Sequence, residues 1–357
     1  MSAQVDAWRD IYRERVVEPD PDPMLIVGAK RHYLMAETKE PFRDYTGGGG
    51  VMPMGHGQEQ VSESIQELAK YFYQTGPDTV QGIQMEFLLW LGKHFSDGWR
   101  YQFYASENEA LHGVAEAMGA YPEQVAWVNR TVPLSDMESW NPTQSGIPNV
   151  AVVAAVDPET YRPLSKGHLE TAYGWHEQGV KIVWDETVAG MGWRGTTVFN
   201  TPFWADAVVL GGAVGGGIPL GVIGGANLRP IREAGRLAGS GIAMTAGLHT
   251  LRQLMVATAH SDAVAMVERL VDKLAELKDK NRFIHDVTGE GLLRSLRLPS
   301  DRIAREFVVE CRRGGALLTR SGEYVKISMP LVCTQRDVDE LVDIMIRAMM
   351  RVQDGHE

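Results

Sequence analysis

The sequence predicts an α/β fold with a mostly parallel central sheet and helices on both of its faces. Across residues 60–245, apolar runs of strand length alternate with amphipathic helical patterns, as in sheets assembled from strand–helix units. Two of these runs end directly in acids or glycines. They are 181–184, followed by Asp185 and Glu186, and 207–210, followed by Gly211 and Gly212. Such residues at the carboxyl ends of strands predict a ligand site at that sheet edge.

Length and charge narrow the classes of function. The chain has 357 residues, which is enough for two domains that share a large core. Hydrophobic residues make up 44% and charged residues 23%, a globular composition. The net charge of −11, from 35 basic and 46 acidic residues, disfavours nonspecific binding to nucleic acid or to anionic membranes.

The two cysteines, Cys311 and Cys333, predict neither a disulfide framework nor a metal site. They are too few for a disulfide scaffold and fit a reducing cytoplasm. Their spacing is not that of metal ligands, so we expect ordinary part-buried thiols. The first 15 residues lack an apolar signal core, and no apolar run approaches the roughly 20 residues of a membrane span. We therefore expect a cytoplasmic protein.

The amino-terminal part predicts a helix, a stiff linker and short strands. Residues 1–20 are highly charged, with Trp8, Ile11 and Tyr12 on one side of a predicted helix. The alternating prolines of 18–23 exclude a helix there. The other elements expected before residue 100 are strands at 24–27, 32–35 and 42–45, four glycines at 47–50, and helices from about residue 58 and over 80–95.

The remaining elements continue this alternation into a carboxyl-terminal α/β segment. One long helix, from residue 242 to about 278, is expected to join the two domains. A last helix should begin at Thr334, with Asp337 three residues on as in a capping box. The other expected elements are strands at 101–104, 150–156, 289–298 and 324–328, a helix that begins at Ser106, and helices at 166–178 and 302–313.

A glycine-rich stretch carries a resemblance to a known family. Residues 210–221 read LGGAVGGGIPLG, after a strand that ends in Asp185 and Glu186. This arrangement resembles the class III aminotransferases, which are fold type I pyridoxal-phosphate enzymes with the segment Leu-Gly-Lys-x-x-Gly-Gly-Gly-x-Pro-Leu-Gly. Within that family, residues 242–252 (IAMTAGLHTLR) are most similar to glutamate-1-semialdehyde 2,1-aminomutase. The resemblance covers nearly the whole chain.

The resemblance implies a fold type I architecture with a large and a small domain. We expect residues 60–245 to form the large domain. Residues 1–59 should supply an amino-terminal segment and part of the small domain, and residues 246–357 the linking helix and the rest of it. The resemblance also implies a homodimer with its site at the subunit boundary, and the glycine-rich stretch 47–57 should be covered by the partner.

The resemblance also assigns cofactor-binding positions. In the family, the strand-end aspartate pairs with the pyridine nitrogen, a helix amino terminus binds the phosphate, and the lysine forms a Schiff base. The matching positions here are Asp185 for the pyridine nitrogen, Ser106, Glu107 and Asn108 for the phosphate, Thr187 under the ring, Gly212 for the lysine, and Arg236 for a threonine that reaches the neighbouring subunit.

Several of these positions depart from the family pattern. Gly212 removes the amine and the general base, and Glu107 places a carboxylate where a phosphate dianion would bind. Residues 119–133 are short and lack the family's aromatic-His-Gly element. Two structural alternatives stay open: Glu107 is also a favourable first-turn acid, and Asp185 could cap a loop.

Two classes of function therefore remain, and the sequence leaves open whether the chain is an enzyme. The first is a divergent aminotransferase or aminomutase that acts on a small amino compound, through non-covalently held pyridoxal phosphate or through a reshaped pocket. The second is a non-catalytic relative that serves as a binding or scaffold protein. We assign no catalytic residue and expect no metal.

Overall fold

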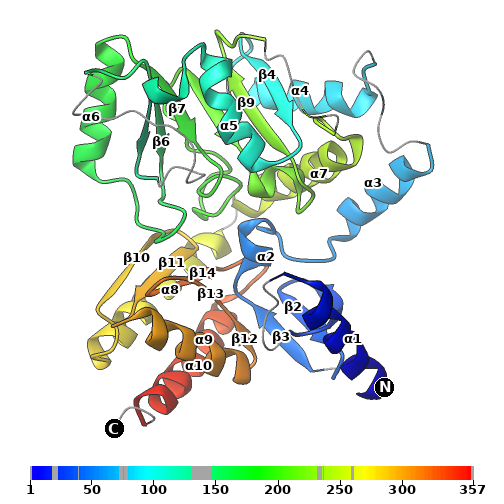
Figure 1. Cartoon of the computed structure of the whole chain (residues 1–357), viewed down its shortest axis with the longest axis vertical. Coiled ribbons are helices and arrows are strands. Elements are labelled where there is room, and N and C mark those ends of the chain that lie inside the picture. The colour runs from blue at the N-terminus through cyan, green and yellow to red at the C-terminus, as the bar shows by residue number, and fades with distance from the viewer. Residues whose placement is uncertain are drawn as a thin grey trace.

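The computed structural model describes residues 2–17, 23–38, 40–71, 75, 79–130, 146–230, 235, 237–258 and 261–354. The large sheet fills the upper part of Figure 1. Its strands, in spatial order, are β4 (Arg100–Tyr104), β9 (Gly221–Gly225), β8 (Ala207–Leu210), β7 (Lys181–Asp185), β6 (Val150–Ala154) and β5 (Val125–Val128). Strands β5 to β8 are parallel, and β9 is antiparallel to both of its neighbours. The sheet is therefore mostly parallel, as the sequence predicts.

Helices cover both faces of this sheet. Alternate strand residues point to opposite faces: Val209 packs in a cluster with the helix α5, whereas Val208 packs with α4 and α7. The helices of this region are α3 (Glu59–Ala69), α4 (Gly82–His94), α5 (Glu107–Met118), α6 (Lys166–Glu177) and α7 (Gly241–Thr258), and the short 3₁₀ turns are η1 (Pro122–Gln124) and η2 (Gly212–Gly215). Apolar burial on both faces explains why the central strands are continuous hydrophobic runs.

Two smaller sheets form the lower part of Figure 1. One contains β1 (Ile26–Lys30), β2 (Tyr33–Ala36), β3 (Pro41–Asp44) and β12 (Ala316–Leu317); the other contains β10 (Asp286–Glu290), β11 (Leu293–Arg297), β14 (Tyr324–Ser328) and β13 (Thr319–Ser321). Because β12 pairs in parallel with β3, the two ends of the chain share a sheet. The domain boundaries given above stay a prediction.

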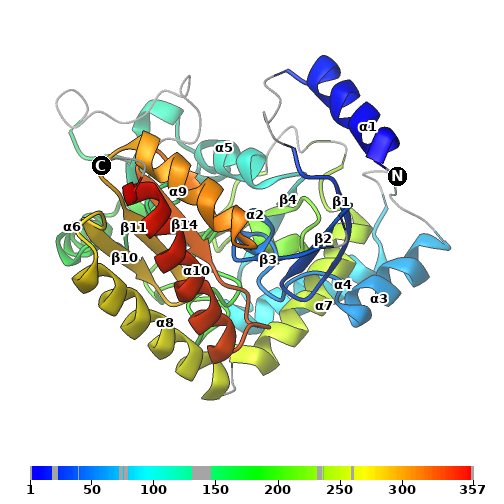
Figure 2. The ribbon, with the colours of Figure 1, turned by 90° about the horizontal axis from the view of Figure 1, so that it is seen from below.

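Three helices accompany the smaller sheets. They are α8 (Ser261–Lys280), α9 (Asp301–Arg313) and α10 (Gln335–Asp354), and Figure 2 shows α10 between α8 and α9. As predicted, α10 follows a capping interaction, in which the Thr334 amide and hydroxyl donate to Asp337 Oδ2 at 2.8 and 2.7 Å. The amino-terminal helix α1 (Ser2–Arg15) lies at the edge of the molecule.

Two expected elements are divided. The helix expected over 242–278 is two helices, with α7 ending at Thr258 and α8 beginning at Ser261. Thr258 Oγ1 donates back to the Leu254 carbonyl at 2.8 Å, and Ser261–Asp262 is a helix-start pattern. The strand expected over 289–298 is a hairpin of β10 and β11 that turns at Gly291.

The glycine-rich stretch 47–57 is partly covered by its own chain, while Gly48, Gly49 and Gly57 are exposed. It begins with the turn α2 (Gly47–Gly50), where the Trp193 indole donates to the Gly50 carbonyl at 3.1 Å. His56 Nε2 lies 2.7 Å from Asp44 Oδ2, a polar contact of the kind expected for a histidine at a helix entry. These contacts cover only part of the stretch, and its coverage by a partner stays a prediction. No helix in the described ranges is long and apolar enough to cross a membrane.

Candidate functional site

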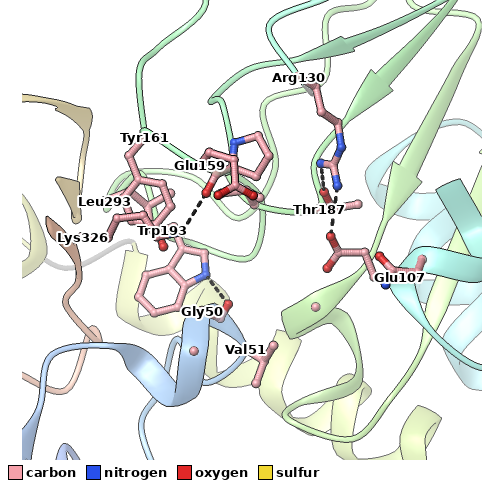
Figure 3. Close-up of a pocket in the computed structure, with 15 residues that line it drawn as sticks. Gly50, Val51, Glu107, Arg130, Glu159, Tyr161, Thr187, Trp193, Leu293 and Lys326 are labelled. Atoms are coloured by element: carbon pink, nitrogen blue, oxygen red, sulfur yellow. Dashed lines mark hydrogen bonds and ion pairs between the residues drawn. The ribbon is translucent and has the colours of Figure 1, made fainter. Parts of the chain in front are cut away.

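A cavity of about 490 Å³ lies between the large sheet and the smaller sheets. The end of β7, the start of α5 and the η2 turn contribute one side of it, and β14 and α2 contribute another. Figure 3 shows Arg130, Thr187 and Glu107 at one end, with Tyr161, Trp193 and Lys326 together at the other. The cavity is therefore at the sheet edge that the sequence predicts.

Asp185 ends β7 and is almost fully buried at 2% exposure. Its Oδ1 accepts hydrogen bonds from the Thr187 amide at 2.8 Å and from the Thr187 hydroxyl at 2.6 Å. Its Oδ2 accepts a charge-assisted hydrogen bond from Arg130 Nη1 at 2.6 Å. Both carboxylate oxygens of Asp185 thus have partners within this chain.

Arg130 is the central cation of the site, and the sequence reasoning missed it. It lies just beyond the carboxyl end of β5, and its side chain is only 6% exposed. Besides Asp185, its guanidinium donates to Thr187 Oγ1 at 2.9 Å and to Glu107 Oε1 at 3.4 Å. A signal was available, because the apolar run 125–128 has strand length and is followed directly by the polar residues Asn129 and Arg130.

The start of α5 is a well-capped helix amino terminus. Ser106 Oγ accepts from the Glu109 amide at 3.2 Å, and Glu109 Oε2 accepts from the Ala105 amide at 3.0 Å. Ser106 therefore acts as the N-cap. The next residue, Glu107, points into the cavity, where burial raises the pKa of its carboxyl group. The nearby charge of Asp185 adds to this increase, and Arg130 opposes it.

Gly212 begins the η2 turn with a left-handed backbone, at φ +54°. A Cβ atom added there would lie 3.1 Å from Glu107 Oε2 and 3.3 Å from the Thr187 carbonyl. A Cβ at Gly211 would lie only 2.6 Å from Glu107 Cγ. The Glu107 side chain thus lies against the turn where the resemblance places the family's lysine.

The far end of the cavity contains a second cation, Lys326 of β14. Its Nζ donates to the Pro158 carbonyl at 2.9 Å and lies 4.8 Å from the centre of the Tyr161 ring. Burial lowers the pKa of this amine, and the charges of Glu159 and Asp157 oppose that decrease. Tyr161 shares a 2.8 Å hydrogen bond with Ser328. The sequence reasoning also missed Lys326, because the fold alone brings β14 to this edge.

Glu186 is buried beside Asp185 but does not line the cavity. Its Oε1 accepts from the Asn200 amide at 2.7 Å and from Thr201 Oγ1 at 3.1 Å. Its Oε2 is buried without a hydrogen-bond partner in the described structure. Burial raises the pKa of Glu186 to about 7, so this carboxyl group titrates near neutral pH.

The structure gathers most of the positions that the sequence assigns. Four of them line the cavity: Glu107, Asn108, Thr187 and Gly212. Asp185 is connected to the cavity through Arg130, and Ser106 serves as the N-cap of α5. Arg236 lies outside the described residues. The roles of these positions in holding a cofactor stay predictions.

Comparison with known proteins identifies the family. The family model for aminotransferase class III matches residues 163–349, more than half of the chain. The chain is 22% identical to glutamate-1-semialdehyde 2,1-aminomutase 2 of Anoxybacillus flavithermus, over 93% of this chain and 92% of that protein. It is 30% identical to the aminomutase of the same name from Shouchella clausii, over 56% of this chain but only 49% of the relative.

A solved structure supports the same fold. The adenosylmethionine-8-amino-7-oxononanoate aminotransferase of Methanocaldococcus jannaschii superposes with a TM-score of 0.86 at 14% identity, covering 97% of this chain and 99% of that one. At this level of identity the likeness shows the fold alone. The family itself implies a pyridoxal-phosphate site in this fold. With the family model matching more than half of its length, the chain belongs to the class III aminotransferases.

Proposed function

We propose that this chain is a pseudo-aminotransferase, which binds a small amino compound in the cavity and performs no pyridoxal-phosphate chemistry. The ion pair between Arg130 and Asp185 carries this proposal. In the family, the aspartate at this position pairs with the pyridine nitrogen of the cofactor. Here a guanidinium from the same chain takes that carboxylate.

The residues of the cavity do not fit the cofactor. A pyridinium needs an accessible acceptor position on Asp185, but Oδ1 accepts two bonds from Thr187 and Oδ2 is paired with the guanidinium of Arg130, a cation of the same sign as the pyridinium. Displacing Arg130 would leave a second buried charge unpaired, which is costly. At the phosphate position, a Glu107 carboxylate that ionises would repel the dianion.

The absence of a lysine at Gly212 also supports a non-catalytic protein. The amine that would hold the cofactor is absent, and Glu107 lies against the turn where it would begin. Loss of a positioned general base alone typically lowers a rate by about 10²–10⁴. We therefore derive no catalytic step through pyridoxal phosphate in this chain.

Charges of both signs at separate ends of the cavity favour an amino compound as its ligand. An ammonium group can pair with Glu107, and an acidic group can pair with Lys326, which donates one of its three N–H bonds to Pro158. Trp193 and Tyr161 supply apolar surface beside Lys326. Such convergent polar groups in a partly apolar cavity are typical of small-molecule sites.

One observation favours the alternative, a divergent enzyme with a reshaped pocket. Lys326 places a partly desolvated amine in the same cavity, and amines of this kind can be activated as nucleophiles. This second function would use a lysine from the smaller sheets in place of the missing one.

The test is a titration of the purified protein with pyridoxal phosphate, followed by absorbance and calorimetry. Borohydride is then added, and any modified lysine is mapped by peptide mass spectrometry. We expect weak or undetectable binding and no preferred lysine. Tight one-to-one binding would overturn the proposal, and a single adduct at Lys326 would establish the alternative.

We also infer that the chain forms a homodimer, as the family resemblance implies. The inference rests on that resemblance, and the exposed glycines Gly48, Gly49 and Gly57 are compatible with a partner on this stretch. Light scattering at micromolar concentration should give twice the mass of the chain. A monomeric mass would contradict the inference.

A further inference from the structure

Three buried side chains of types that commonly bind metals lie close together in the region formed by the two smaller sheets and their helices. They are His32, between β1 and β2, Cys333, in the loop after β14, and Asp337, in the first turn of α10. One donor atom from each lies within 4.8 Å of the others, and all three residues are buried. We propose that this group, the His32–Cys333–Asp337 cluster, binds one zinc ion.

The imidazole of His32 is the observation that points to a ligand. His32 is 2% exposed, and neither ring nitrogen satisfies a hydrogen bond with any described residue. Its Nε2 nevertheless lies 3.1 Å from Asp337 Oδ1. Buried polar groups are normally hydrogen-bonded, so a buried imidazole that approaches a carboxylate without hydrogen-bond geometry, and whose other nitrogen has no partner among the described residues, requires an explanation. A metal ion between the two side chains supplies one.

The other two side chains leave suitable atoms available. Asp337 uses Oδ2 to accept both capping bonds from Thr334, which directs Oδ1 toward His32. Cys333 is a free thiol in the interior. No disulfide competes for its sulfur, and metal binding would require the loss of its proton. The cluster thus offers one nitrogen, one sulfur and one oxygen donor.

This donor set selects the kind of metal. Thiolate and imidazole ligands favour zinc over the harder calcium and magnesium ions. Tetrahedral zinc with ligands at about 2.0–2.3 Å requires donor atoms roughly 3.4 Å apart. His32 and Asp337 already meet that spacing at 3.1 Å, so only modest movement of side chains is needed to close the cluster. A water molecule would complete the four ligands.

The cluster is separate from the cavity described above, since none of its three residues lines that cavity. A metal there would join the turn between β1 and β2 to the start of α10. It would therefore fix the amino-terminal strands to the carboxyl-terminal helix. The sequence does not reveal it, because its three ligands are far apart along the chain and meet only in the fold.

The experiment uses the full chain, stripped with a chelator and titrated with Zn²⁺ against a chromophoric competitor. We expect one zinc per chain, bound with submicromolar affinity. Cys333→Ser and His32→Gln should each weaken binding by at least about 100-fold. Cys311→Ser is the matched control, because Cys311 is also buried but lies in α9, outside the cluster; it should bind like the unmodified protein.

A second measurement guards against variants that fail to fold. Co²⁺ added to the unmodified, stripped protein should produce the near-ultraviolet charge-transfer absorption of a thiolate–cobalt bond. Its absence would overturn the proposal whatever the variants do. Equal zinc binding by Cys333→Ser and Cys311→Ser would also overturn it, and would show that the cluster is a packed histidine–aspartate pair beside an ordinary thiol.

Discussion

Neighbouring strands of the large sheet end in chemically different ways. β7 ends in Asp185, which the resemblance assigns to the pyridine nitrogen of the cofactor, whereas β8 leads to Gly212, which the resemblance assigns to the family's lysine position. Asp185 is bonded to Arg130, and the Glu107 side chain lies against Gly212. The comparison shows that side chains of this chain occupy both positions that the resemblance assigns to the cofactor.

The largest expected effect comes from removing the partner of Asp185. Arg130→Met should lower the free energy of unfolding by about 3–5 kcal/mol, because it leaves the buried Asp185 carboxylate without a counter-ion. Urea unfolding measures the change. The control is Arg252→Met, which breaks an exposed ion pair with Glu86 and should cost no more than about 1 kcal/mol. Equal losses in the two variants would show that the Arg130 pair is no more than a surface contact.

A second prediction concerns Glu186, next to Asp185 on the same strand end. Its pKa rises from 4.5 when exposed to about 7 in the fold, so between these values the folded state binds more protons than the unfolded state. Its contribution to stability therefore falls as pH rises through this window. The unfolding free energy of the unmodified protein, minus that of Glu186→Gln, should decrease by about 3 kcal/mol from pH 4 to pH 8.

The control for this pH series is Glu63→Gln, at an exposed position of α3. Its difference from the unmodified protein should stay nearly flat over the same range. A flat difference for Glu186→Gln as well would mean that the carboxyl group has an ordinary pKa in the folded protein. A rising difference would mean that the ionised form is stabilised.

The smallest expected effect is the change in stability caused by a substitution at Gly212, the glycine that follows β8. Gly212→Ala should lower the unfolding free energy by about 1–2 kcal/mol, because alanine is strained at φ +54°. Gly49→Ala is the matched control, since Gly49 has φ +75° but an added Cβ there would meet nothing within 4 Å. Any excess loss at Gly212 reports contact with Glu107 and Thr187. A smaller loss at Gly212 than at Gly49 would contradict the tight packing of Glu107 against the turn.

Much of the fold could be predicted from the sequence, because the evidence for it is local. The apolar runs that became β7 and β8 and the helix start at Ser106 follow from periodicity and capping. The resemblance then placed Asp185 and Gly212 at one sheet edge. The prediction of one continuous helix after residue 242 was wrong, because the chain forms two helices there. The apolar pattern continues through this region, but local signals end one helix at Thr258 and begin the next at Ser261.

The new partners in the site could not be predicted in the same way. Arg130 follows β5 and Lys326 lies in β14, far away in the chain, and only the folded arrangement brings both to the cavity. The sequence around a charged residue at a strand end does not indicate which buried acid that residue will pair with. Ion pairs between distant elements are set by tertiary packing, which a single sequence records only indirectly.

The central claim is that Arg130 takes the place of the cofactor on Asp185, and a pair of variants tests it most directly. Gly212→Lys restores the amine, and Gly212→Lys combined with Arg130→Met also frees the carboxylate. Both are titrated with pyridoxal phosphate, with circular dichroism to verify folding. We expect internal-aldimine absorbance in the double variant and little in Gly212→Lys alone, where the lysine would meet Glu107 and Asp185 stays paired. Full aldimine absorbance in Gly212→Lys alone would contradict the claim, because it would mean that only the amine is missing from an otherwise intact cofactor site.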